Sequence, residues 1–366
     1  MNYVFVALTF LTSVIVAWII IPRILLISIK KKLFDEPNER KIHEFVVPRL
    51  GGVSFFPTIL FAVCSVFALR YLFGFEVKAV IAEYILPEML LFICGLTLLY
   101  VIGIADDLIG VQYRNKFIIQ ILCAVFFPVS GLWINNLYGL MGINEISAWV
   151  GMPLTVLTIV FITNAINLID GIDGLASGLS SVSLAVFGCL FLEKELYTYS
   201  MIAFASLGVL IPFFYFNVFG NAELGRKIFM GDTGSLTLGY ILSFLAIRYS
   251  HYNPDFTPYT QGALVIAFST LIVPAFDVIR VVFLRARKGK GLFLPDKNHI
   301  HHKFLAMGLT PRHAMITILI ISCLFSTSNI LLVSYVNITA LLLSDLTVWI
   351  VLNCWWDIIR DKKLKN

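Results

Sequence analysis

Apolar runs long enough to cross a lipid bilayer recur along this chain of 366 residues. A transmembrane helix takes about 20 mainly apolar residues, because the hydrocarbon core is about 30 Å thick. The runs predict eleven such helices, at residues 4–29, 51–73, 87–105, 117–134, 150–168, 175–192, 198–217, 234–250, 261–284, 313–334 and 338–356. Several runs lie so close together that ten helices also satisfy the pattern. The chain is therefore predicted to be an all-α, polytopic integral membrane protein.

The composition supports this class. Hydrophobic residues make up 59% of the chain and charged residues only 13%, which excludes an ordinary soluble domain. Neither a repeat, nor a low-complexity segment, nor a soluble domain interrupts the pattern. We therefore expect one transmembrane domain over residues 1–366, embedded in the bilayer and without a nucleic-acid partner. A homodimer is compatible with the sequence.

The positive charges predict an orientation. The first apolar run follows an N-terminus without a positive side chain and is itself followed by Lys30-Lys31-Lys32, which favours an uncleaved helix with its N-terminus outside. In that orientation, only four of the 27 lysines and arginines fall on the outer side or at outer helix ends: Arg70, Lys78, Lys194 and Arg248. The positive-inside rule thus places the other positive charges at the cytoplasmic face.

Acidic and amide side chains gather at the same predicted face: Asp106, Asp107, Asn164, Asn167, Asp170, Asp173 and Asp232. Ionisable groups so close to hydrocarbon are costly and mark a functional site. Asp106 and Asp107 are adjacent, and two such carboxylates repel each other unless a cation or a shared proton intervenes. The alternative for this pair is a solvated helix end with two ordinary acids.

The strongest signal is the segment 161–178. Asn164, Asn167 and Asp170 step by three and so lie along one flank of a helix. Glycines on either side of Asp173 free the backbone to turn that carboxylate toward the same site. Amide and carboxylate oxygens suit Mg²⁺ rather than Zn²⁺. The alternative is that these side chains hydrogen-bond between helices as packing contacts.

Asp232 lies at the start of another apolar run, within Phe229–Ser235. Its carboxylate is a candidate cap for the first amides of that helix, and this role does not exclude binding a metal. The glycines beside it allow phosphate oxygens to approach a helix N-terminus.

Two basic loops complete the candidate site. The loop 285–312 carries three histidines in four positions, His299, His301 and His302, which we interpret as contacts for an anion or a sugar. For its lysines, the alternative is an ordinary positive-inside loop. The early loop contains His43 and Arg49, and it ends in Gly-Gly at a helix start, which is a candidate phosphate contact.

Together these segments resemble the polyprenyl-phosphate N-acetylhexosamine-1-phosphate transferases, glycosyltransferase family 4. The resemblance covers residues 30–312 and rests on motifs in family order: D-x-P-x-x-R-K-x-H with P-R-x-G-G (35–52), A-D-D-x-x-G (105–110), N-A-I-N-L-I-D-G-I-D-G-L-A-S-G (164–178), F-M-G-D-x-G-S-L (229–236), and R-x-R-x-G-K with P-D-K-N-H-I-H-H (285–302). The His-Ile-His-His form resembles the branch that starts O-antigen, enterobacterial common antigen or wall teichoic acid synthesis. The branch of phospho-MurNAc-pentapeptide transferase instead has three consecutive histidines and a threonine-rich version of 48–52.

The resemblance implies an enzyme of the bacterial inner membrane with its active site at the cytoplasmic face. Such an enzyme transfers an N-acetylhexosamine-1-phosphate, most commonly GlcNAc-1-phosphate, from a UDP-sugar to undecaprenyl phosphate and releases UMP. It uses Mg²⁺, or Mn²⁺ in its place. Which UDP-sugar is used, and for which polymer, is not determined by the motifs.

The resemblance also implies roles for individual residues. The metal ligands are Asn167 and Asp232. The acidic pair that faces the acceptor phosphate is Asp106 and Asp107. The uracil lies between Asp173, which hydrogen-bonds it, and Phe229, which stacks on it, while Asp170 supports the pyrophosphate and ribose of the donor. The pyrophosphate or the sugar is gripped by Arg285, His299, His301 and His302.

A rival from another class is an ion-coupled transporter, since acids inside a membrane also mark transport pathways. Transporters place such acids near the midplane, usually within repeats. Here the acids gather at one predicted face, which favours the transferase.

Overall fold

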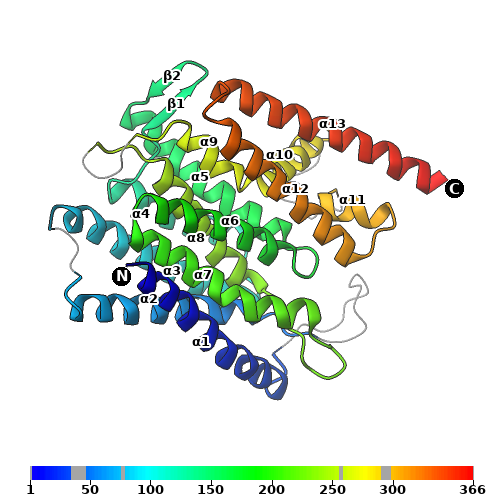
Figure 1. Ribbon diagram of the computed structural model, residues 1–366. Helices are drawn as coiled ribbons and strands as arrows, with labels where there is room; N and C mark the ends of the chain where they lie inside the picture. Colours follow the sequence, from blue (N-terminus) through cyan, green and yellow to red (C-terminus); the bar gives the residue numbers. More distant parts are fainter. Residues whose placement is uncertain (1, 34–46, 76–78, 255–258, 290–297, 366) are drawn as a thin grey trace.

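The computed structural model describes residues 2–33, 47–75, 79–254, 259–289 and 298–365. Of the predicted site residues, His43 lies outside this part of the chain. The bundle of helices in Figure 1 carries a short β-ribbon at one end and the short helix α11 at the other.

Each predicted apolar run coincides with a helix or a pair of helices. The helices are α1 (Asn2–Lys30), η1 (Gly51–Ser54), α2 (Phe55–Leu72), α3 (Ala79–Ile109), α4 (Tyr113–Val129), α5 (Ala148–Ile169), α6 (Leu175–Glu193), α7 (Tyr197–Phe214), η2 (Tyr215–Phe219), α8 (Gly231–Ser250), α9 (Ala263–Ser269), α10 (Ile272–Arg287), α11 (Ile300–Ala306), α12 (Pro311–Leu332) and α13 (Ile338–Lys365). The protein is thus a multi-pass membrane protein.

Length and apolarity alone support fewer spans than the sequence pattern indicated. Within the described residues, eight helices are long and apolar enough to cross a membrane, and α9 with α10, bent by 78°, makes a ninth. The helices α4, which has only 17 residues, and α8 do not meet this standard by themselves. The predicted count of eleven, or ten, stays a prediction.

The all-α prediction needs one correction, because residues 136–145 form a β-ribbon. Strand β1 (Asn136–Leu140) pairs antiparallel with β2 (Ile143–Glu145). The two residues between them, Met141 and Gly142, both have positive φ, 53° and 78°. Two such residues in succession make the tight turn whose twist matches that of paired strands, so this connection between α4 and α5 is a hairpin.

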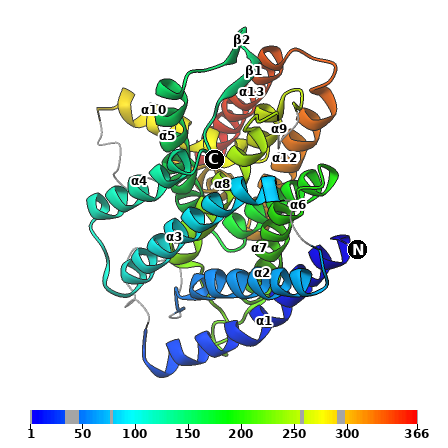
Figure 2. The same cartoon turned by 90° about the vertical axis from the view of Figure 1, so that its left-hand side faces the viewer.

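Helix α8 lies at the centre of the bundle, packed against α3, α5, α6 and α9 (Figure 2). Every residue from Thr233 to Ser250 is buried. Small residues let the neighbouring backbones approach: a Cβ on Gly103 of α3 would lie 2.5 Å from the Cα of Thr233, and one on Gly239 would lie 2.6 Å from the Cα of Thr163 on α5. This packing brings the C-terminal ends of α3 and α5 to the N-terminal end of α8.

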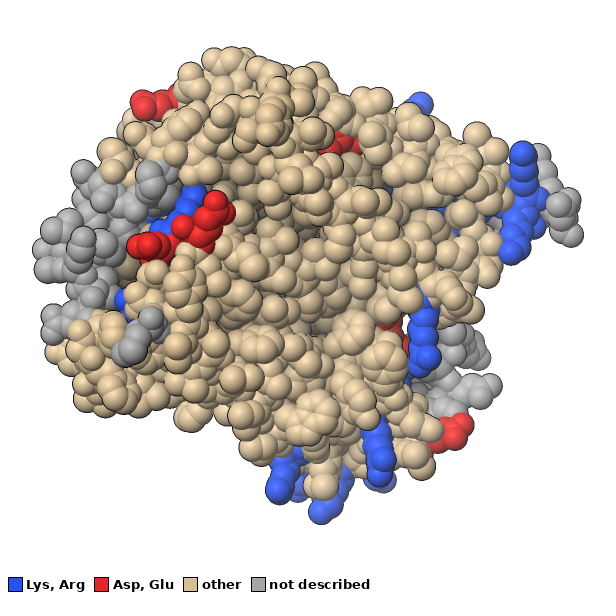
Figure 3. Space-filling view, viewed as in Figure 1, with Lys and Arg blue, Asp and Glu red and all other residues tan. Residues whose placement is uncertain are grey.

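Charged side chains mark the ends of the bundle rather than its flank. In Figure 3 a broad surface with few lysine, arginine, aspartate or glutamate side chains separates the charged groups at opposite edges. Such an apolar band matches a bilayer core, in which charged groups are rare.

Candidate active site

Asp107, at the end of α3, caps the first turn of α8. Its Oδ1 accepts the backbone N–H of Asp232 at 2.7 Å, and its Oδ2 accepts the backbone N–H of Thr233 at 3.0 Å and the hydroxyl of Thr233 at 2.5 Å. A carboxylate at a helix N-terminus is favoured both by these free amides and by the helix dipole. The prediction that Asp232 caps this helix was therefore wrong, since Asp107 takes that position.

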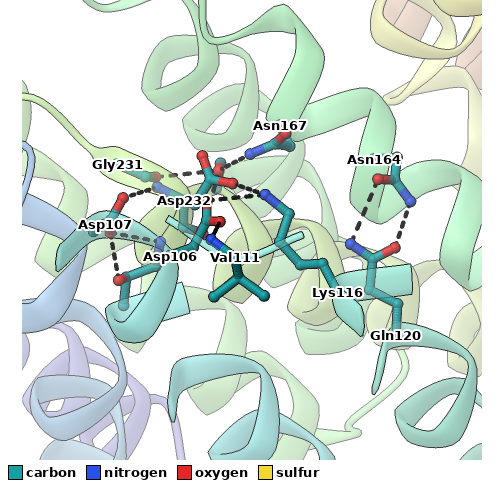
Figure 4. A network of polar contacts seen from close by, with 11 residues as sticks. Asp106, Asp107, Val111, Lys116, Gln120, Asn164, Asn167, Gly231 and Asp232 are labelled. Carbon is teal, nitrogen blue, oxygen red and sulfur yellow. Dashed lines mark hydrogen bonds and ion pairs between the residues drawn. The ribbon is translucent and has the colours of Figure 1, made fainter. Parts of the chain in front are cut away.

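Asp106 and Asp232 share one ammonium group. Lys116 of α4 lies with its Nζ 3.0 Å from Asp106 Oδ2 and is also bonded to Asp232 Oδ2, as Figure 4 shows. The backbone N–H of Val111 donates to the other oxygen of Asp106 at 2.7 Å. Two carboxylates from helices distant in sequence are thus held together by a cation between them.

Asn167 of α5 stands beside this group, and its amide donates to the hydroxyl of Ser235 at 2.8 Å. The oxygens of Asp106, Asp232 and Asn167 form a hard donor set that fits Mg²⁺ or Mn²⁺. The position of the Lys116 ammonium between the two carboxylates indicates that this point favours positive charge. Within the described residues, three or more His, Cys, Asp or Glu side chains do not converge as a ready-made metal cluster, so an amide ligand and outside oxygens would have to complete the shell.

Asn164 does not join this group. Its amide exchanges hydrogen bonds with Gln120 of α4, at 2.6 and 3.4 Å, and donates to the carbonyl of Val160. Figure 4 shows this pair apart from the carboxylates. For Asn164 the packing interpretation holds, and the expectation that the whole polar flank points to one site was wrong.

The segments 48–52 and 229–231 run side by side through backbone hydrogen bonds. Phe229 N–H donates to Pro48 O, Gly51 N–H to Phe229 O, and Gly52 N–H to Met230 O, at 2.8 to 2.9 Å. These two glycine amides are therefore already bonded, which removes them as the expected phosphate contact. The side chain of Arg49 is exposed at this edge.

Gly231 is required at the junction. Its φ is +72°, and a Cβ there would lie 2.0 Å from the carbonyl oxygen of Arg49 and 2.6 Å from Asp107 Oδ2. A side chain at this position would separate α3, α8 and the 48–52 segment, so the glycine allows the three to meet.

The loop after α5 brings two further acids to the site. Asp170 is half-buried, and burial followed by the nearby charges of Asp232 and Asp173 raises its pKa to about 7. Asp173 is paired with Lys227, whose Nζ lies 2.5 Å from Asp173 Oδ2 and 5.7 Å from the centre of the Phe229 ring. The two residues expected to hold the uracil therefore lie on either side of one lysine.

Asn217 connects the 170–174 loop to the segment 227–229 through two hydrogen bonds. Its side-chain oxygen accepts the N–H of Gly174 at 2.7 Å, and its side-chain amide donates to the carbonyl of Ile228 at 2.9 Å. Asn217 is buried in the wide turn η2 that ends α7. It fixes the 170–174 loop relative to the segment that carries Lys227 and Phe229.

Helices α10 and α11 hold His299 and His301 near the 170–174 loop. Asp277 of α10 is fully buried and accepts the Nδ1–H of His299 at 2.9 Å and the N–H of Ile300 at 3.1 Å. Because a carboxylate can only accept here, His299 keeps its Nε2 for another partner. Arg285 is buried in the last turn of α10.

His301 packs its ring against Gly171, where a Cβ would lie 2.1 Å from its Nε2. Burial, followed by the nearby His302, lowers the pKa of His301 to about 3, so its ring is neutral near pH 7. Within the described residues, neither ring nitrogen of His301 has a hydrogen-bond partner. Buried imidazole nitrogens usually have hydrogen-bond partners. The ring of His301 is therefore suited to hydrogen-bond a ligand at the 170–174 loop.

Sequence reasoning missed four residues that build the site: Lys116, Asn217, Lys227 and Asp277. One signal was available for Asp277, a lone acid inside an apolar run, which marks function in a membrane helix. Lys116 also stood out as a lysine in the first turn of an apolar helix, where the dipole disfavours positive charge. The partners of Asn217 and Lys227 depend on contacts between distant segments and left no local signal.

The fold and the site define a multi-pass membrane protein with a polar, acidic site at one end of its bundle. Glycosyl transferase family 4 matches residues 89–250 of the chain. A relative from Bacillus subtilis (strain 168), named probable undecaprenyl-phosphate N-acetylglucosaminyl 1-phosphate transferase, is 32% identical over 95% of this chain and 87% of its own length.

Two further relatives are named undecaprenyl-phosphate alpha-N-acetylglucosaminyl 1-phosphate transferase. The one from Salmonella typhi is 29% identical over 80% of this chain and 74% of its own length. The one from Escherichia coli (strain K12) is 28% identical over 82% of this chain and 77% of its own length. The chain belongs to the polyprenyl-phosphate N-acetylhexosamine-1-phosphate transferase family, glycosyl transferase family 4.

Proposed function

We propose that the protein transfers GlcNAc-1-phosphate from UDP-GlcNAc to undecaprenyl phosphate at the cytoplasmic face of a bacterial inner membrane. The names of its relatives support the acceptor and the sugar. The observation that carries the chemistry is the group of Asp106, Lys116, Asn167 and Asp232 at one end of the bundle. It offers oxygen ligands and a positive charge for a phosphate.

The reaction exchanges one phosphoanhydride bond for another. An oxygen of the lipid phosphate bonds to the phosphorus that carries the sugar, and the bond from that phosphorus to the bridging oxygen breaks, so the bridging oxygen leaves with UMP. A phosphate has a second pKa near 6, so the nucleophile is already an anion at neutral pH. Positioning and neutralisation of charge then matter more than a strong base.

The chain's own residues supply the positioning. Asp107 fixes the first turn of α8 and thereby the carboxylate of Asp232. Arg49 and Arg285 supply positive charge for the phosphates, and His299, set by Asp277, presents its Nε2 to the donor. A bound Mg²⁺, held by Asn167, Asp232 and Asp106, would lower the repulsion between the two phosphate-bearing substrates.

The nucleotide would lie between Asp173 and Phe229. Lys227 now bridges these residues, so the ammonium would have to move or share Asp173 when a base enters. The 170–174 loop would carry Asp170 beside the donor pyrophosphate. In this proposal the lipid acceptor would approach from the side of α3, which carries Asp106 and Asp107.

The test is UMP release by the purified protein in detergent, with undecaprenyl phosphate present or omitted. We expect release from UDP-GlcNAc only with the lipid, complete inhibition by EDTA, and recovery with Mg²⁺ or Mn²⁺. A panel of UDP-sugars with mass detection of the lipid product identifies the sugar. Asp232→Asn should abolish turnover and keep the fold. Activity undiminished by EDTA would refute the metal assignment, and a product containing MurNAc-pentapeptide would favour the peptidoglycan branch.

A further inference from the structure

Helix α11, which carries His301 and His302 and begins after His299, has only seven residues, Ile300–Ala306. A helix this short is not stable by itself in water. Its position must therefore come from the elements it contacts. One contact is the bond of Asp277 to His299 and to the first amide of α11. A second contact lies at the end of α13 that is predicted to be cytoplasmic.

Lys303 of α11 makes this second contact. Its Nζ lies 3.0 Å from Asn353 Oδ1, 3.3 Å from the carbonyl oxygen of Asn353 and 3.0 Å from Asp357 Oδ1. The side chain of Lys303 is only 2% exposed. An ammonium group has three donors, and burying it is costly unless they are paired. All three acceptors come from α13.

The same face of α13 makes further contacts. Arg360 donates to the carboxylate oxygen of Asp357 that also binds Lys303, at 3.0 Å. The ring of Trp356 meets Phe304 of α11 edge to face, with centroids 4.9 Å apart. Lys363 donates to the carbonyl of Met307, just after α11, at 2.8 Å.

The contacting residues of α13, at 353, 356, 357, 360 and 363, follow the spacing of one helix face. In Figure 1 the last turns of α13 lie beside α11. This face and Lys303 together form what we name the α13 latch.

We propose that the α13 latch positions the histidines of the donor site, and that Lys303 and Asp357 are positioning residues for donor binding. The inference rests on the proposed function, in which the histidines contact the nucleotide sugar. The link to the donor loop is direct, because the ring of His301 packs on Gly171 and a shift of α11 moves that ring. Within the described part of the chain, the contacts of the latch do not include Asp106 or Asp107, so its loss should act on one substrate.

The experiment compares Asp357→Asn and Lys303→Met with a matched control, Asp361→Asn. Asp361 also pairs with Arg360 on α13, at 2.9 Å, but is exposed and does not contact Lys303. For each variant, the Michaelis constants for UDP-GlcNAc and undecaprenyl phosphate are measured, together with hydrogen exchange of the α11 amides. The amides of Lys303 and Met307 report on the helix, since they bond to His299 O and Lys303 O.

We expect Asp357→Asn and Lys303→Met to raise the constant for UDP-GlcNAc about tenfold, which corresponds to about 1.4 kcal/mol of binding. The constant for undecaprenyl phosphate should stay within about twofold, and exchange of the α11 amides should accelerate. Lys303→Arg, which keeps a charged donor, should recover most of the donor affinity, and Asp361→Asn should match the wild type.

An unchanged donor constant in both variants, or an equal change in Asp361→Asn, would overturn the proposal. Equal loss for both substrates would also overturn it, because that result indicates general unfolding. If the wild type releases no UMP from UDP-GlcNAc, the proposed function fails, while the exchange measurement still tests the latch by itself.

Discussion

The cap formed by Asp107 leads to a prediction that separates the two adjacent acids. In Asp107→Asn, the side chain keeps one acceptor oxygen, while its NH₂ replaces the other. The best amide orientation keeps the two bonds from Thr233 and loses the bond from the Asp232 amide. A hydrogen bond to a charged group contributes about 1.5–3 kcal/mol and one between neutral groups about 1 kcal/mol.

The loss in the free energy of unfolding can be summed from these hydrogen bonds. One charged hydrogen bond disappears and two become neutral, which together lower the free energy of unfolding by about 2.5–7 kcal/mol. Thr233→Val removes only the hydroxyl bond and should cost about 1.5–3 kcal/mol. Asp106→Asn should cost less than Asp107→Asn, because among the described residues Asp106 accepts one backbone and one side-chain donor, from Val111 and Lys116, whereas Asp107 accepts three donors from the first turn of α8.

The assay is unfolding in mixed micelles titrated with a denaturing detergent, paired with the rate of UMP release. We expect Asp107→Asn to lose stability and activity together, and Asp106→Asn to lose activity with little loss of stability. If Asp107→Asn keeps the wild-type free energy of unfolding and still loses turnover, Asp107 acts on the acceptor phosphate and the capping argument is refuted.

Three further predictions concern the nucleotide, the orientation and pH. Phe229→Ala should raise the Michaelis constant for UDP-GlcNAc roughly tenfold to a hundredfold, since stacking on an aromatic ring contributes about 1–3 kcal/mol, and should barely change that for undecaprenyl phosphate; an unchanged donor constant would show that Phe229 only packs. In a variant without native cysteines, a cysteine at Asn298 should resist an impermeant thiol reagent in intact cells and one at Asn253 should react; the reverse pattern would overturn the orientation. Because the pKa of Asp170 is raised to about 7 in the folded protein, its contribution to stability is present below the pKa of the unfolded chain, near 4, and is lost as pH rises through 7. In EDTA, the wild type should therefore lose thermal stability between pH 4 and 7 more steeply than Asp170→Asn, and parallel curves would exclude this titration.

Several features of the site could be predicted from sequence because they depend on local patterns. Apolar runs fixed the helices, and the acids at helix ends indicated which end of the bundle carries the site. Asp106, Asn167 and Asp232 are brought to one place, as expected. The family also followed from motifs, and the comparison with relatives confirmed it.

Other features depended on contacts that no local pattern encodes. Residues spaced by three drift about 60° around a helix at each step, so Asn164 turns to Gln120 on α4 while Asn167 faces α8. Asp107, and not the predicted Asp232, caps α8, because α3 and α8 are packed closely at Gly103. The hairpin at 136–145 was missed because its turn, Met141-Gly142, lacks the usual Asn-Gly pair.

The complete burial of α8 has a consequence for the membrane in which the protein works. A helix that meets lipid tilts or bends when its length does not match the bilayer. Helix α8 is shielded by its neighbours, so such mismatch acts first on the outer helices, whose side chains are exposed along α1 and α13. Changes in bilayer thickness should therefore displace the carboxylate of Asp232, in the first turn of α8, very little. We expect turnover to vary little between vesicles of short and long acyl chains.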